Sequence, residues 1–317
     1  MSEQARDPEK ILLWLEWTVI RRLDGLLHGD YRSLFRGFGV DLADLREYQF
    51  HDDVRHIDWN VTARLQTPYV RVYNEDRDVT AWFLLDLSPS VSFGSERVEK
   101  RSVAIDFVTV LARLLSRHGI PVGALFYGDR VDTVIPARGG RRHVLHILSR
   151  MLSRPEQRGS AATDLKDLLQ ASRQVIPRRS IVFVVSDFIS APGWEGALAL
   201  LARRHEIVAV RLYDPLEMEL PDLGLLVFQD AETGDLAWVD THDRGFRKRF
   251  VAAAGRREAA LRTAFSDAGV DALELSTTDD LVDAILRFAD LRKRRRQLSA
   301  GGSLPQHLGG THVVPVA

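Results

Sequence analysis

Side chains that carry hard oxygen ligands follow two apolar runs that lie far apart in the sequence. The run at residues 80–90, TAWFLLDLSPS, ends in Asp86, Ser88 and Ser90. The run at residues 180–188, SIVFVVSDF, ends in Asp187. Carboxylate and hydroxyl oxygens, together with retained waters, are the ligands that Mg²⁺ takes, and Mn²⁺ suits the same set. The residue types therefore predict a divalent-metal site.

The pattern around these runs predicts the elements that would position them. Both runs are short and rich in branched and aromatic residues, as buried strands are. Further strands are expected at 121–128, 130–137, 206–214 and 271–277, and helices at 101–118, 141–152, 164–175, 193–205, 245–268 and from 280. A hairpin is expected at 225–240. Strands that alternate with helices indicate an α/β fold with a doubly wound, mostly parallel sheet.

In such a sheet, ligands bind beyond the carboxyl ends of the strands. Thr163, at the expected loop-to-helix start between the two runs, supplies a third segment. Each segment also has an ordinary interpretation. DLSPS is a good turn, Thr163 could cap the helix that begins at Asp164, and Asp187 could cap a helix or close a turn. The convergence of all three on one edge favours a metal with a coordination position left open.

Composition bounds the class of protein. The chain has 317 residues, 45% of them hydrophobic, which suits one α/β domain with an appendage. A formal net charge of -1 gives no global attraction to nucleic acid or to an anionic membrane. The absence of cysteine excludes disulfides, thiol catalysis, iron–sulfur clusters and thiolate zinc sites.

The first segment, residues 1–36, is expected to hold a helix over 9–28. Its apolar side chains near one face are Leu12, Leu15, Val19, Leu23 and Leu26, with Trp14 and Trp17 beside them. The helix either docks on the body or offers a surface to a partner or to a membrane interface. The apolar run at 11–20 carries Glu16, is too short to cross a bilayer and lacks the features of a secretory signal. We therefore expect a cytoplasmic protein without a transmembrane segment.

Residues 37–79 are dense in charges and aromatics, and no strand alternation is visible until PYVRVY at 68–73. A long irregular segment in a compact protein is usually functional or held by polar contacts. It is either an internally ion-paired lid or a surface that reads a partner. The residues available for internal pairing are Asp52, Asp53, Asp58, Arg46, Arg55 and Arg64. The final residues, within a basic tail at 293–317, have no periodicity and are expected to be disordered.

Two stretches of the chain resemble known families. Asp86, Ser88 and Ser90, followed by Thr163 and Asp187, resemble the metal-ion-dependent adhesion site of von Willebrand factor A domains, and the order of elements over residues 80–292 is similar throughout. The stretch GFGVDLADLREYQFHDDVRHIDWNVTAR, residues 37–64, resembles the signature of the domain of unknown function numbered 58. It departs from that signature at Phe50 and His51, where Pro-Gly is more common.

The resemblance implies a non-catalytic, metal-dependent interaction protein. It implies that the serine hydroxyls bind Mg²⁺ or Mn²⁺ directly, that Thr163 binds directly or through water, and that Asp86 and Asp187 act mostly through water. The open position would take an Asp or Glu from a client protein. It also implies a MoxR-type AAA+ ATPase as partner, for which this chain would act as adaptor or co-chaperone.

The main rival class is a metal-dependent, phosphatase-like hydrolase that uses Asp86. In phosphoaspartyl hydrolases the second residue after the nucleophile is normally Asp, whereas Ser88 cannot titrate near neutrality. The motifs GxxxxGK[ST], HExxH and GxSxG do not occur.

His143 and His146 have a spacing that can ligate a metal, but their arginine neighbours favour an exposed helix face. RKRRR at 292–296 could bind phosphates or offset a helix dipole.

Overall fold

The structure is a computed structural model that describes residues 7–23, 45–48, 62, 67–71, 79–95, 98–155, 163–229 and 235–299. Its centre is a six-stranded sheet in the order β10-β7-β6-β3-β4-β5. The strands are β3 (Ala81–Asp86), β4 (Val122–Tyr127), β5 (Val131–Arg138), β6 (Ile181–Ser186), β7 (Glu206–Tyr213) and β10 (Asp271–Ser276). All neighbouring pairs are parallel except β4 and β5. The predicted α/β fold with a mostly parallel sheet is confirmed.

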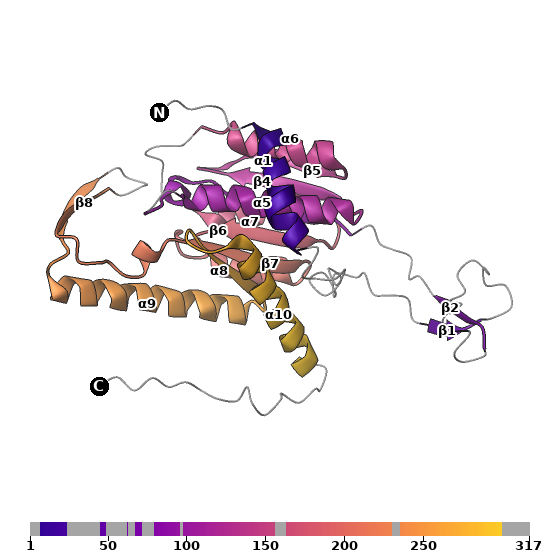
Figure 1. Ribbon diagram of the computed structural model, residues 1–317. Coiled ribbons are helices and arrows are strands. Elements are labelled where there is room, and N and C mark those ends of the chain that lie inside the picture. The colour runs from indigo at the N-terminus through magenta and orange to yellow at the C-terminus, as the bar shows by residue number, and fades with distance from the viewer. Residues whose placement is uncertain are drawn as a thin grey trace.

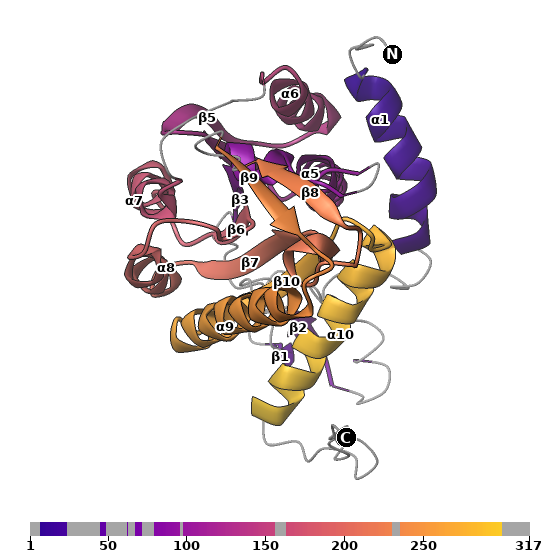
Figure 2. The same ribbon diagram turned by 90° about the vertical axis from the view of Figure 1, so that its left-hand side faces the viewer.

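Helices cover both faces of this sheet, because alternate residues of each buried strand point to opposite sides. Phe83 and Leu85 belong to one apolar cluster, and Trp82 and Leu84 belong to the other. The first cluster includes α1 (Pro8–Leu15), α5 (Lys100–Arg117), α6 (Arg141–Leu152) and α10 (Leu281–Ser299). The second includes α7 (Leu165–Val175), α8 (Trp194–Ala202) and α9 (Arg244–Asp267). Figure 1 shows the layers, and Figure 2 shows α7 and α8 on the opposite side of the sheet from α5 and α1.

The N-terminal helix docks on the body. After α1 the chain continues as a π-helix, Glu16–Ile20, and stays helical to Leu23. Leu12, Leu15 and Leu23 are buried in the first cluster, while Trp14 and Trp17 are exposed. The guanidinium of Arg113 on α5 also donates to the carboxylate of Glu16 at 2.5 Å. Leu26 lies outside the described residues.

Two small sheets complete the described part of the chain. β8 (Leu225–Gln229) and β9 (Leu236–Asp240) form the expected hairpin. β1 (Leu45–Glu47) pairs antiparallel with β2 (Tyr69–Arg71). The sequence analysis saw no strand alternation before residue 68, because β1 is only three residues long and too short for its alternation to be visible. Asp52, Asp53 and Asp58 lie outside the described residues, as does most of the family signature at 37–64, of which the structure describes only 45–48 and 62.

Two further findings concern the ends of the chain. Arg292, in the basic run at 292–296, is buried and pairs with Asp271 and Glu206, so it is not available to phosphates. The tail from residue 300 onward lies outside the described residues. Among the helices that the structure describes, none combines the length and the apolar character that crossing a bilayer requires.

Candidate metal centre

The centre lies where the direction of strand addition reverses. The chain moves outward from β3 to β4 and β5, and then returns to place β6 on the other side of β3. β3 ends at Asp86, and β6 runs parallel to it and ends just before Asp187. Ligand sites of doubly wound sheets are found at this reversal, beyond the carboxyl ends of the strands. The two strands therefore deliver their carboxylates to the same edge.

The turn after β3 is built around Asp86. Its Oδ1 accepts a hydrogen bond from the backbone amide of Ser88 at 3.0 Å, and its Oδ2 accepts one from the hydroxyl of Ser186 at 2.7 Å. Pro89 then starts a short 3₁₀ helix, Pro89–Ser92. This geometry brings the Oγ atoms of Ser88 and Ser90 to 3.2 Å from each other. The interpretation of DLSPS as a turn is correct, and the turn is also what brings the two hydroxyls together.

Burial and charge act together on Asp86. Its side chain is fully buried, and burial, followed by the negative charge of Asp187, raises its pKa to about 6. The hydrogen bonds from Ser88 and Ser186 act in the opposite direction, because they stabilise the ionised form. The centre therefore holds a carboxylate whose charge lacks full compensation within the protein.

Thr163 comes to the centre from the loop before α7. Its carbonyl accepts hydrogen bonds from the amide of Ala191 at 2.9 Å and the hydroxyl of Ser190 at 3.1 Å, which ties it to the loop after β6. The neighbouring amide of Asp164 donates to the Tyr127 hydroxyl, at the end of β4, at 2.9 Å. The Asp164 side chain caps α7 by accepting from the Lys166 amide. The alternative in which Thr163 is the cap is therefore wrong.

Asp187 meets a cation that the sequence analysis missed. Its Oδ1 accepts from the Ile189 amide at 3.0 Å, which closes a turn, and its Oδ2 accepts from the Lys100 ammonium at 2.8 Å. The same ammonium lies 2.5 Å from Oε1 of Glu217. Burial lowers the pKa of Lys100, but the charges of Asp187 and Glu217 outweigh burial and hold that pKa above its usual value. Lys100 is therefore a protonated, buried neighbour of the centre.

The donor set fits Mg²⁺ or Mn²⁺. Two ligands at adjacent corners of a Mg²⁺ octahedron stand about 3 Å apart, given metal–oxygen distances of about 2.1 Å. The serine hydroxyls have nearly this spacing, whereas the oxygens of both carboxylates already accept hydrogen bonds from the protein. Hydroxyls are thus the direct ligands on offer, and the carboxylates supply charge from behind. The described residues contain no cluster of three or more His, Asp or Glu side chains suited to a metal.

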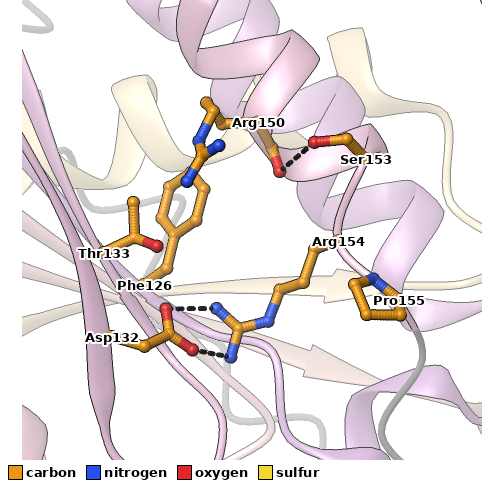
Figure 3. Close-up of a pocket in the computed structure, with 7 residues that line it drawn as sticks. All are labelled: Phe126, Asp132, Thr133, Arg150, Ser153, Arg154 and Pro155. Atoms are coloured by element: carbon orange, nitrogen blue, oxygen red, sulfur yellow. Dashed lines mark hydrogen bonds and ion pairs between the residues drawn. The ribbon is translucent and has the colours of Figure 1, made fainter.

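Two other features, the His143–His146 pair and a hollow between β5 and α6, carry polar side chains that make internal contacts. His143 Nε2 lies 2.8 Å from the Val122 carbonyl, so the ring is tied to β4, and burial lowers its pKa. A hollow of ≈ 310 Å³ lies between β5 and the C-terminal end of α6. It is lined by Phe126, Asp132, Thr133, Arg150, Ser153, Arg154 and Pro155. Figure 3 shows the Arg154 guanidinium facing the Asp132 carboxylate, at 2.7 Å. The hollow includes none of the five residues of the candidate centre.

Two solved structures resemble the fold. The crystal structure of the conserved hypothetical protein BatB from Bacteroides thetaiotaomicron has a TM-score of 0.40 at 15% identity and covers 68% of this chain and 99% of that chain. The structure of an aerotolerance-related membrane protein from Bacteroides fragilis has a TM-score of 0.45 at 12% identity, with the same coverage of 68% and 99%. These scores are too low to support an inference about the site.

Relatives in sequence are closer. An uncharacterized protein of Mycobacterium tuberculosis (strain ATCC 25618 / H37Rv) is 36% identical over 280 residues, which make up 88% of this chain and 88% of that protein. An uncharacterized protein of Mycobacterium avium is 34% identical over 169 residues, 53% of this chain and 98% of that protein. A family model described as "Protein of unknown function DUF58" matches residues 44–260. The chain therefore belongs to the DUF58 family.

Proposed function

We propose that this protein is a non-catalytic, cytoplasmic interaction module with a von Willebrand factor A-like body, in which a bound Mg²⁺ or Mn²⁺ captures a carboxylate of a partner protein. One observation supports this proposal most. The three segments that carry Asp86, Thr163 and Asp187 are held to one another at one edge of the sheet: the Ser186 hydroxyl bonds Asp86, the Asp164 amide bonds the Tyr127 hydroxyl, and the Ser190 hydroxyl bonds the Thr163 carbonyl. A helix cap or a surface turn would not require that convergence.

The residues of the centre divide into two roles. The hydroxyls of Ser88 and Ser90 would hold the cation directly, because they are neutral oxygens at nearly the right spacing. Thr163 would bind it directly or through water. Asp86 and Asp187 would act through water, because protein donors already fix their orientation. A cation held mainly by neutral oxygens retains enough positive charge to attract an external Asp or Glu. The serine-bearing turn fixes where that carboxylate would bind.

Calorimetric titration with Mg²⁺ and Mn²⁺ tests the metal. We expect Asp86→Ala and Ser88→Ala to abolish uptake while circular dichroism shows the fold intact. Ser172→Ala is a matched control, because Ser172 is equally buried but its hydroxyl bonds the Leu169 carbonyl within α7. Uptake that is unchanged in Ser88→Ala would refute the proposed centre.

The proposed partners are a MoxR-type AAA+ ATPase and a client that presents Asp or Glu. The family resemblance carries this part of the proposal. A pull-down with such an ATPase should weaken when a chelator is added and again in Ser88→Ala, but not in Ser172→Ala. An interaction that is indifferent to both changes would have to use another surface, such as residues 37–79.

The hydrolase alternative is less well supported. Phosphoaspartyl hydrolases normally carry a second Asp as acid/base two positions after the nucleophile, whereas the residue two positions after Asp86 is Ser88, which cannot titrate near neutrality. Metal-dependent hydrolysis of a model phosphate ester by the wild-type protein, lost in Asp86→Asn, would favour the hydrolase instead.

A further inference from the structure

Lys100 occupies a position that is unfavourable for a cation. It is the first residue of α5, where the unpaired amides of a helix N-terminus create positive potential. Its side chain is only 1% exposed. A buried ammonium at such a place requires strong compensation. The compensation comes from Asp187, a member of the candidate centre, and from Glu217.

The ammonium has two carboxylate partners of different kinds. Asp187, 2.8 Å away, is fully buried at the end of β6. Glu217, 2.5 Å away, is 14% exposed and ends a 3₁₀ helix, Pro215–Glu217, whose cap is Asp214. The second partner lies outside the five residues of the centre. Lys100 can therefore remain paired with Glu217 if Asp187 turns toward another cation.

We propose that Lys100 sets the affinity of the centre for divalent cations: its ammonium competes for Asp187, and it compensates that carboxylate while no metal is bound. This inference rests on the proposed metal centre. Two cations that share one carboxylate repel each other, and the repulsion is strong where water is excluded. Binding of Mg²⁺ or Mn²⁺ is consequently weaker and more easily reversed than the five residues of the centre would give without Lys100.

A purely structural ion pair would behave differently. It would stabilise the fold, and its removal would weaken metal binding at this edge of the sheet. An internal competitor has the opposite signature, because its removal lowers stability without metal but raises affinity for metal. The direction of the change in affinity separates the two roles.

The experiment measures the Kd for Mn²⁺ by calorimetry and by electron paramagnetic resonance, together with the Tm of the metal-free protein. For Lys100→Gln we expect a lower Tm without metal and a Kd at least tenfold lower than that of the wild type. Lys100→Arg keeps the charge and should show no gain in affinity. Glu217→Gln leaves the ammonium wholly to Asp187, so its Kd should rise severalfold.

Arg113→Gln is the matched control. Arg113 lies on the same helix, about 20 Å beyond Lys100, and pairs with Glu16 away from the centre. It should leave the Kd for Mn²⁺ unchanged. If Lys100→Gln does not fold, the double variant Lys100→Gln/Glu217→Gln, which removes one charge of each sign, replaces it with the same expected gain.

The outcomes separate this inference from the proposed function. The role of Lys100 would be overturned if the Kd of Lys100→Gln for Mn²⁺ were equal to or higher than that of the wild type. The metal centre would remain supported in that case if the wild type binds Mn²⁺ and Ser88→Ala does not. If Lys100→Gln takes up metal and the wild type does not, the role of Lys100 is supported and metal-dependent function in the wild type is overturned. No uptake by either protein would overturn both.

Discussion

At the scale of single residues, the candidate centre stores electrostatic free energy in Asp86. Between about pH 4 and pH 6 the folded protein binds the Asp86 proton more tightly than the unfolded chain does, because the pKa rises from 3.8 to about 6 on folding. The free energy of unfolding therefore falls as the pH rises through this window, by up to about 3 kcal/mol. Above it, the ionised carboxylate opposes folding unless a cation is bound.

Asp86→Asn should consequently stabilise the metal-free protein. The amide removes the buried charge, and its oxygen can still accept from the Ser88 amide. We expect a gain of about 1–3 kcal/mol at pH 7 and a smaller one at pH 4.5, measured by urea unfolding in the presence of a chelator. Asp164→Asn, which retains a helix cap, is the control and should change little. A loss of stability at pH 7 would mean that the charge of Asp86 is already compensated.

Residue types at strand ends were enough to predict that the segments of Asp86 and Asp187 lie at one edge of the sheet, because a turn residue directly after a buried strand has its place fixed by the strand. Lys100 could not be predicted in this way. Its partners lie 87 and 117 residues away, and no local spacing records such a contact. A weak signal existed, since Lys100 is a lysine in a chain whose basic residues are nearly all arginine.

At the scale of elements, the N-terminal helix separates its two sides sharply. Leu15 is 1% exposed within the first apolar cluster, whereas Trp14 is 58% exposed. Leu15→Ala should lower the free energy of unfolding by about 2–5 kcal/mol, because it removes a buried side chain and leaves a cavity. Trp14→Ala should change it by less than about 0.5 kcal/mol. Guanidinium unfolding measures both, and equal effects would contradict docking of the helix through this face.

β7 begins next to a histidine that the fold keeps neutral. His205 is buried, and neither of its ring nitrogens has a hydrogen-bond partner among the described residues. Burial, followed by the charge of Arg204, lowers its pKa from 6.5 to about 4. The unfolded chain therefore binds the proton more tightly than the folded protein does between these values. Stability is fully present above about pH 6.5 and is lost as the pH falls toward 4.

His205→Leu should remove this dependence. The difference in unfolding free energy between pH 7.5 and pH 4.5 should shrink by about 2–3 kcal/mol, because no proton can then be taken up at this position. Urea unfolding at the two pH values measures it. His146→Leu, at an exposed position of α6, serves as the control. An unchanged pH dependence in His205→Leu would show that another group carries it.

Regular elements were predictable to within a few residues wherever an apolar period ran for several residues, as in α6, where the expected and observed bounds agree. The short strand β1 was not, because three residues cannot display a period. Thr163, the alternative cap of α7, lies one residue before the observed cap, Asp164. Thr163 and Asp164 are both good caps by residue type, and the local pattern does not record contacts with distant segments such as that of the Asp164 amide with the Tyr127 hydroxyl.

At the scale of the whole molecule, the sequence indicates a mostly parallel sheet but not the order of its strands. Alternation of strands and helices is recorded locally, whereas the return from β5 to β6 across β3 depends on which faces pack together. That return is what places Asp187 beside Asp86. The candidate centre is thus a property of the topology, and a bound cation would add a further link between segments that the sheet and a few hydrogen bonds already connect.

A cation that joins these segments should stabilise the whole fold, by about 2.7 kcal/mol at a concentration one hundred times its Kd. Because the proposed site draws on each segment, a single substitution in any of them should remove nearly the whole increment. We expect Thr163→Val to lose the rise in Tm caused by Mg²⁺ as completely as Ser88→Ala does. Thr109→Val, at a buried hydroxyl within α5, should retain it. A Thr163→Val protein that kept the full rise, measured by calorimetry, would remove that segment from the centre.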